Sequence, residues 1–237
     1  MELINLMITM VAINVFAYLT IRLRPVFFKT KLFKPMIWNF KLSLMPIIIL
    51  LITSLLYLVS MYTYAHTEMI LFVYLAYLVF VVGLILWILM LPNSGYLITE
   101  LNMTHRLDDV VEVPIWYEII SVMSFALSGI INTLVNIVFL QLIFLVGFDP
   151  EYITKKTFIS FIITAIILNV LVAIGVYLGR QIRFNSLDVL HPKSFLKKLK
   201  NHFNSSRVFF EFILFVAMHA TFFMILYYAL GIQRIFI

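Results

Sequence analysis

Six long apolar runs constrain this chain of 237 residues more strongly than any other feature of its sequence. They lie near residues 3–21, 42–64, 69–91, 117–147, 157–179 and 208–231. A helix needs about 20 apolar residues to cross a bilayer, and a backbone surrounded by lipid must satisfy its own hydrogen bonds. Since the runs are too long for barrel strands, the sequence predicts an all-α fold. We expect one integral membrane domain over residues 1–237, a polytopic helix bundle with six transmembrane helices.

The composition agrees with a membrane protein and excludes several kinds of chemistry. Hydrophobic residues make up 64% of the chain and charged residues 12%, whereas soluble domains contain about half and a quarter. The chain has no cysteine, which excludes disulfides, cysteine nucleophiles and thiolate metal sites. No HExxH, P-loop, GxSxG or GxGxxG sequence occurs, so the familiar hydrolase and nucleotide-binding signatures are missing. The first run lacks the basic start and cleavage site of a signal peptide, and we expect it to be a retained helix.

Lysine and arginine are concentrated in two of the segments that separate the apolar runs. Residues 22–41 carry six of them and residues 180–207 carry seven, while residues 92–116 carry only Arg106. The other three are Lys155, Lys156 and Arg234. Because an excess of Lys and Arg marks cytoplasmic loops, both the N-terminus and the C-terminus should face outside. The net charge of +6 then indicates anionic inner-leaflet lipids of the bilayer as partners, and not nucleic acid.

Two of the basic segments are also amphipathic. In residues 193–203, the side chains of Phe195, Leu196, Leu199 and Phe203 would share one helical face that the lysines largely avoid. Such a helix lies flat on an anionic membrane surface. Residues 25–34 look like a shorter version of the same pattern. We expect both segments to anchor the protein at the inner leaflet.

The fourth apolar run is longer than a bilayer requires. At about 1.5 Å per residue, residues 117–147 would extend about 46 Å, against a hydrocarbon core of roughly 30 Å. The helix would therefore tilt, project beyond the membrane, or break near residues 129–132. It cannot cross the membrane twice, because the basic loop 180–207 would then face outside.

Polar residues also recur inside the apolar runs. Ser124, Ser128, Asn132 and Asn136 follow one another at four-residue steps. Amides are costly in lipid, so this stripe must face other helices or water. It would either hold helices together or line a cavity or substrate path. Asn169 in the fifth run is a candidate partner, and His219 in the sixth would either bond a carbonyl or amide group or relay protons.

Residues 91–101, LPNSGYLITEL, place polar side chains directly after the third apolar run. Pro92 ends or kinks that helix, and Asn93 or Ser94 could cap a new short one. In helical spacing Tyr96, Thr99 and Glu100 share a face. The sequence therefore predicts an interfacial helix with one polar side.

The segment that follows is acidic, between two basic loops. Its carboxylates are Glu100, Asp108, Asp109, Glu112 and Glu118. Three interpretations stay open: salt bridges that clamp the loops together, a site for a phosphate-bearing headgroup or metabolite, and a metal site. His105, Asp108, Asp109 and Glu112 are of types that suit Mg, Mn or Zn, but their spacing matches no common ligand motif.

Three ordered blocks carry a resemblance to a known family. They are LPNSGYLITEL (91–101), VPIWYE (113–118) and GVYLGRQIRFNSLD (175–188). Together they resemble the family of bacterial predicted multi-pass membrane proteins known as DUF1361. The matching positions are Asn93, Tyr96, Thr99, Glu100, Pro114, Trp116, Tyr117, Glu118, Gly179, Arg180, Arg183, Asn185, Ser186 and Asp188. Phe184 and Leu187 stand where the family pattern has tryptophan, and Glu118 stands where it has aspartate.

The resemblance implies an integral membrane protein of bacteria, which would lie in the cell (inner) membrane, and it implies no particular reaction. Since the charge pattern places all three blocks on the cytoplasmic face, we expect them to line a polar pocket there. The candidate binding residues are Asn93, Tyr96, Thr99, Trp116, Tyr117, Arg180, Arg183, Asn185, Ser186 and Asp188. Glu100 and Glu118 are the candidates for a catalytic base, should the protein be an enzyme.

Three function hypotheses follow from the sequence. In the first, the arginines of the pocket hold an anionic lipid headgroup or a phosphate-bearing small molecule. In the second, the protein is a small transporter or permease subunit, and the stripe that contains Asn132 and Asn136 lines its path. In the third, it is a membrane assembly or immunity-type partner of another membrane protein and has no pocket. The sequence indicates no cofactor.

Overall fold

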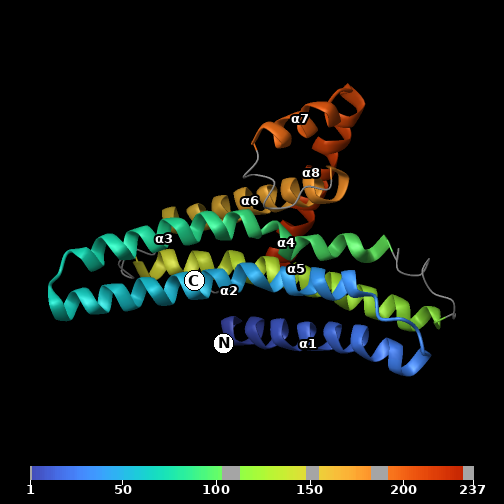
Figure 1. The fold of residues 1–237 in the computed structure, drawn as a ribbon, viewed down its shortest axis with the longest axis horizontal. Helices are drawn as coiled ribbons and strands as arrows, with labels where there is room; N and C mark the ends of the chain where they lie inside the picture. The colour runs from blue at the N-terminus through green and yellow to red at the C-terminus, as the bar shows by residue number, and fades with distance from the viewer. Residues whose placement is uncertain (1, 103–112, 148–154, 183–191, 232–237) are drawn as a thin grey trace.

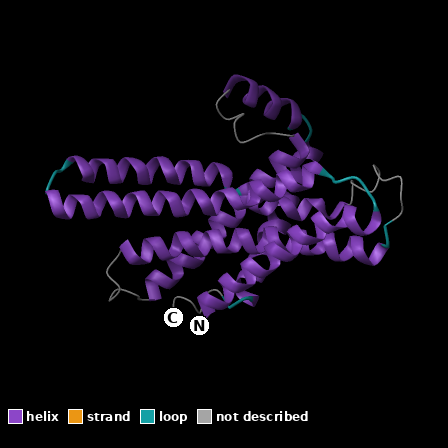
Figure 2. Ribbon diagram, turned by 60° about the horizontal axis from the view of Figure 1, so that its bottom comes forward, coloured by secondary structure: helices purple, strands orange, loops and turns teal. Residues whose placement is uncertain are grey.

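The structure, a computed structural model, describes residues 2–102, 113–147, 155–182 and 192–231. The described elements are α1 (Glu2–Phe28), α2 (Lys34–Thr67), α3 (Leu71–Met90), α4 (Pro92–Tyr96), the 3-10 helix η1 (Leu97–Asn102), α5 (Ile115–Gly147), α6 (Lys155–Tyr177), the π-helical turn η4 (Leu178–Ile182), α7 (Pro192–His202) and α8 (Ser206–Ala229). Within these ranges the chain forms helices and connecting loops, and no strand (Figure 2). The prediction of an all-α fold is confirmed.

Six helical stretches in the described part of the chain are long and apolar enough to cross a membrane. They are Leu3–Phe28, Lys34–Thr67, Leu71–Thr99, Ile115–Ile143, Ile159–Ile182 and Ser206–Ala229. Each contains most of one apolar run of the sequence. The protein is therefore a multi-pass membrane protein with six spans, as predicted, while the outward orientation of its termini stays a prediction.

Helix α5 lies at the centre of the bundle (Figure 1). Within its apolar stretch 78% of the residues are buried inside the protein, compared with 17% in the spans of α3 and α8. It runs without a break from Ile115 to Gly147, so the fourth run forms one long helix and does not break near residues 129–132. Helices α1 and α2 and the α4–η1 segment pack around it.

Helices α2 and α3 form a long antiparallel hairpin whose tip reaches beyond the other helices (Figures 1 and 2). At the end of α2, Glu68 adopts a left-handed conformation with φ of 54°, and its N–H donates to the carbonyl of Tyr64 over 2.8 Å. Farther along the hairpin, the two helices approach closely where Gly83 faces Thr53. Most side chains of the hairpin tip are exposed, as expected for residues that face lipid.

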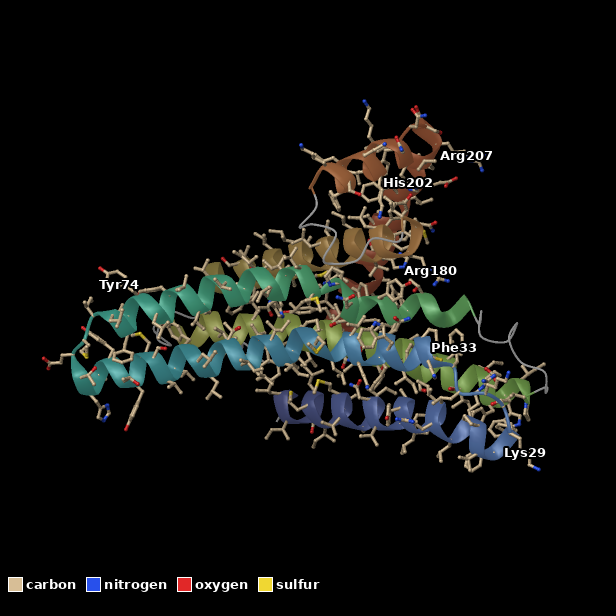
Figure 3. The ribbon with its side chains drawn as sticks, viewed as in Figure 1. Lys29, Phe33, Tyr74, Arg180, His202 and Arg207 are labelled. Carbon is tan, nitrogen blue, oxygen red and sulfur yellow. The ribbon has the colours of Figure 1, made fainter. Side chains whose placement is uncertain are left out.

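One end of the bundle carries the basic loops, and we call it the basic end. In Figure 3, Lys29, Phe33 and Arg180 lie towards this end and Tyr74 lies towards the opposite end. Helices α1 and α6 finish here, and α2 and α5 begin here. Helix α7 stands apart from the central helices near this end, and α8 continues from it (Figure 1).

One of the two expectations for amphipathic surface helices is wrong. Residues 25–34 do not form a separate surface helix, because α1 continues through Pro25 to Phe28 and α2 begins at Lys34. The chain turns between them at Lys29, whose φ is 55°. By contrast, the segment 193–203 forms the amphipathic helix α7, which the sequence predicted.

Candidate functional site

A buried ion pair joins the end of α1 to the start of α5. The Arg24 Nη2 atom lies 2.7 Å from Glu118 Oε1, and Arg24 Nε donates to the same oxygen over 2.8 Å. The two side chains are 7% and 1% exposed. Glu118 lies in the first turn of α5, where the helix dipole also favours a negative charge.

Three hydroxyl groups beside the ion pair strengthen the same helix contact. Tyr117 Oη donates to the carbonyl of Thr20 over 2.6 Å, and Ser121 Oγ donates to Thr20 Oγ1 over 3.1 Å. The Tyr117 ring packs edge-on against Phe28 at 4.8 Å between ring centroids. The second signature block thus binds the end of α1 through both its charge and its hydroxyl.

A cleft opens next to this ion pair. Its lining residues are Ile21, Arg24, Pro25, Lys31, Phe33, Met36 and Ser121, and its cavity volume is about 10 Å³. A cavity of this volume has room for about one water molecule. The cleft is therefore far smaller than a typical ligand pocket, and Lys31 places a positive charge in its wall.

The first signature block is buried between helices and is not an interfacial helix on the surface. Ser94 and Leu97 are both 0% exposed. Residue Leu91 caps α4 without a side-chain hydrogen bond, so the expectation that Asn93 or Ser94 would cap a new helix is wrong. Asn93 Nδ2 instead donates to the carbonyl of Met90 over 3.0 Å, and Ser94 Oγ donates to the carbonyl of Ser43 over 2.9 Å. These bonds tie the block to α3 and α2.

The first and third blocks are in direct contact. A Cβ atom on Gly175 would lie 2.3 Å from Pro92 Cγ, and one on Gly95 would lie 2.7 Å from a methyl group of Val172. These two glycines allow α4 to pack against α6, because any larger side chain would collide there. Gly175 lies three residues before the π-helical turn η4, which contains Arg180.

The predicted binding residues have different environments. Tyr96 and Thr99 are half-buried, and Thr99 Oγ1 donates to the carbonyl of Tyr96 over 2.7 Å. Trp116 is 62% exposed, whereas Tyr117 is buried. Arg180 is half-exposed and makes no hydrogen bond or ion pair within the described residues. The side chain of Glu100 and the predicted residues Arg183, Asn185, Ser186, Asp188, His105, Asp108, Asp109 and Glu112 lie outside the described part of the structure.

The polar stripe of α5 forms a hydrogen-bond network with three other helices. The amides of Asn14 and Asn132 bond each other reciprocally, over 2.7 and 3.0 Å. Asn132 Nδ2 also donates to Ser43 Oγ over 3.1 Å, and Trp87 Nε1 donates to Asn136 Oδ1 over 2.9 Å. Asn132 and Asn136 are both 0% exposed. These amides hold α1, α2 and α3 against α5, and they are not exposed to a cavity.

The other intramembrane polar residues lie on α8 or contact it. Asn169 does not bond the α5 stripe; its Nδ2 lies 3.1 Å from Met224 Sδ on α8. His219 Nδ1 lies 3.0 Å from the carbonyl of Phe215, one turn earlier in the same helix. Gln141, which the sequence analysis did not single out, accepts a hydrogen bond from Tyr227 over 3.1 Å and donates to the carbonyl of Phe161 over 2.8 Å.

The sequence analysis also missed Arg24 and Asn14 as site residues. Arg24 was counted only as one of the loop charges, and Asn14 lies within the first apolar run. The sequence did contain a signal for both residues, because an arginine or an amide within or next to an apolar segment is costly in free energy. Such a side chain is expected to have a polar partner on another helix.

A family model described as "Protein of unknown function (DUF1361)" matches residues 38–226. The chain belongs to this family. The DUF1361 match contains all three signature blocks, and with them Glu118, Asn132 and Arg180. Arg24 and Asn14, which pair with two of these residues, lie on α1, ahead of the matched range. No curated protein and no solved structure matches the chain.

Proposed function

We propose that this DUF1361 protein binds anionic lipid headgroups at its basic end. The observation that carries the proposal is α7, an amphipathic helix that stands apart from the central helices (Figure 1). Its four lysines, Lys193, Lys197, Lys198 and Lys200, are exposed, and Leu196 on its apolar side is 59% exposed. A helix with exposed lysines and exposed leucine matches a membrane surface better than it matches water.

The attachment of α7 supports this function. Tyr177 Oη on α6 lies 2.9 Å from His202 Nε2 at the end of α7. Phe203, the next residue, stacks on Tyr177 with ring centroids 6.3 Å apart. The C-terminal end of α7 is thus held against the bundle by Tyr177, a residue of the third signature block.

The charges are sufficient for preferential binding to an anionic surface. Each lysine near such a surface contributes about 1 kcal/mol. Lys193, Lys197 and Lys200 alone would therefore favour anionic over neutral lipid by about 3 kcal/mol. Arg180 adds a half-exposed guanidinium without a partner in the described residues, and a guanidinium suits a phosphate group.

The transport hypothesis has less support than headgroup binding. A substrate path along α5 would require polar side chains that face an opening, but the amides of Asn132 and Asn136 bond other helices. The assembly hypothesis would need an exposed apolar surface for a partner protein. In a membrane protein such a surface is expected in any case, because it contacts lipid.

Because the chain has no cysteine, a single introduced cysteine can report on α7. A polarity-sensitive fluorophore would be attached to Leu196→Cys, with Phe222→Cys, an exposed position on the apolar helix α8, as the control. We expect a blue shift of the fluorophore at position 196 in nanodiscs of phosphatidylglycerol and phosphatidylcholine, relative to phosphatidylcholine alone. The control should not respond to the lipid charge.

The triple variant Lys193→Gln/Lys197→Gln/Lys200→Gln should strongly reduce this shift, because only Lys198 remains on the helix. High salt should also weaken it, because exposed charges are screened. An emission spectrum at position 196 that is the same in both lipids would refute the proposal. So would a shift that is as large in the triple variant as in the unsubstituted helix.

A further inference from the structure

We propose that the surface around the turn between α1 and α2 binds anionic phospholipid headgroups. This surface, which we call the turn surface, consists of Lys29, Lys31, Lys34, Trp38 and Lys41. The inference goes beyond the proposed function, which depends on α7, because it assigns a second and separate contact with lipid. In Figure 3, Lys29 lies on the opposite side of the bundle from His202, at the end of α7.

The turn surface carries an excess of positive charge. Residues 22–41 contain six basic residues and no acidic residue. The two arginines have partners, since Arg24 pairs with Glu118, and Arg22 Nε donates to Tyr18 Oη over 2.9 Å. The four lysines are exposed, and within the described residues they form no hydrogen bond or ion pair. The described part of the chain therefore leaves four positive charges without a counter-charge.

Three residues of the turn surface form a stripe along α2. Lys34, Trp38 and Lys41 follow one another at steps of four and three residues, so they share one face of the helix. Trp38 is 62% exposed, and the lysines on either side of it are exposed as well. Tryptophan is enriched where headgroups meet acyl chains, and lysine side chains near helix ends extend from there to the charged layer. The stripe thus fits the boundary of a membrane.

Exposed apolar side chains on the neighbouring helices lie at the same end of the bundle. Just ahead of the turn on α1, Val26 is 70% exposed and Phe27 is 60% exposed. On α5, Trp116 is 62% exposed, and the adjacent Tyr117 packs against Phe28. A free anion would use only the lysines, whereas a lipid surface uses the lysines and the apolar side chains together. This combination favours anionic lipid as the partner.

Quenching of tryptophan fluorescence by brominated lipids tests the turn surface in the full-length protein. The chain has three tryptophans, and Trp87 is 0% exposed, so Trp116→Phe leaves Trp38 as the exposed one. The nanodiscs contain equal amounts of phosphatidylglycerol and phosphatidylcholine, with bromine on the acyl chains of one lipid or of the other. We expect the ratio of phosphatidylglycerol to phosphatidylcholine beside Trp38 to exceed the bulk ratio about fivefold. This factor corresponds to one lysine near an anionic surface.

Two quadruple variants in the Trp116→Phe background separate the turn surface from α7. Replacement of the four turn lysines with glutamine should reduce the enrichment at Trp38 to less than twofold, and replacement with arginine should retain it, because arginine keeps the charge. Replacement of the four α7 lysines with glutamine is the matched control. It removes the same number of charges from the other side of the bundle and should leave the enrichment at Trp38 unchanged. The α7 lysines are Lys193, Lys197, Lys198 and Lys200.

Equal quenching of Trp38 by the two brominated lipids would overturn the inference. An enrichment that persists after removal of the turn lysines would overturn it too, since the lipid would then be attracted by other groups. Loss of the enrichment in the α7 variant alone would assign the attraction to α7 and not to the turn surface. The fluorophore at position 196 reports on α7 separately, so the failure of one lipid contact can be distinguished from the failure of the other.

Discussion

Replacement of Glu118 with glutamine should destabilise the protein far more than the loss of an ordinary surface charge. Glutamine keeps the size of the side chain and an oxygen that can accept from Arg24, but it removes the negative charge. Arg24 would then stay 6% exposed without a counter-charge from α5. Removal of one partner from a buried ion pair costs about 3–5 kcal/mol. Because the amide retains one hydrogen bond, we expect the free energy of unfolding to fall by about 3 kcal/mol, near the lower end of this range.

A second ion pair in the same protein provides the control. Arg207 and Glu211 are four residues apart on α8, with Nε and Oε1 3.1 Å apart and side chains that are 87% and 56% exposed. Such helical surface pairs contribute about 0.3–0.5 kcal/mol. Glu211→Gln makes the same chemical change as Glu118→Gln, so the difference between the two variants isolates the effect of burial.

The assay is equilibrium unfolding in mixed micelles with increasing sodium dodecyl sulfate, followed by circular dichroism. The double variant Arg24→Gln/Glu118→Gln should recover part of the stability that Glu118→Gln loses, because it leaves no unpaired charge. The reasoning is refuted if Glu118→Gln is no less stable than Glu211→Gln. It is also refuted if the effects of the two substitutions at the buried pair simply add.

Two further predictions concern packing and topology. Gly83→Ala should lower the free energy of unfolding by about 1–3 kcal/mol in the same assay, because the added Cβ would collide with the Thr53 side chain. A second substitution, Thr53→Ala, should restore part of this stability. An unchanged unfolding midpoint in Gly83→Ala would contradict the close α2–α3 contact. If the basic loops face the cytoplasm, Asn204 lies inside the cell and Thr67, at the end of α2, lies outside. Asn204→Cys should then react with a membrane-impermeant maleimide only after cell lysis, whereas Thr67→Cys should react in intact cells. The opposite labelling pattern would reverse the predicted orientation.

The sequence predicted the site less completely than the fold. It identified Glu118 as a functional candidate, but the described partner of this carboxylate is Arg24, 94 residues away in the chain. It expected an interfacial helix after Pro92, but Ser94 and Leu97 are buried between helices. It predicted that the α5 stripe faces other helices or water, and the structure places Asn132 against Asn14. In each case the sequence identified a candidate residue or segment but did not predict which helix it contacts.

This difference arises because some properties depend only on a short stretch of sequence, whereas others depend on contacts between distant stretches. The length and hydropathy of a segment determine whether it can cross a bilayer, and the spacing of lysines and leucines determines whether a helix such as α7 is amphipathic. The sequence by itself therefore determined the six spans and the basic amphipathic helix. A membrane helix that is apolar on all sides gives no comparable signal for its rotation, because lipid is as apolar as the protein core. Only the tertiary structure decided which helices are neighbours, and with them the pairs Arg24–Glu118 and Asn14–Asn132 and the contact between Pro92 and Gly175.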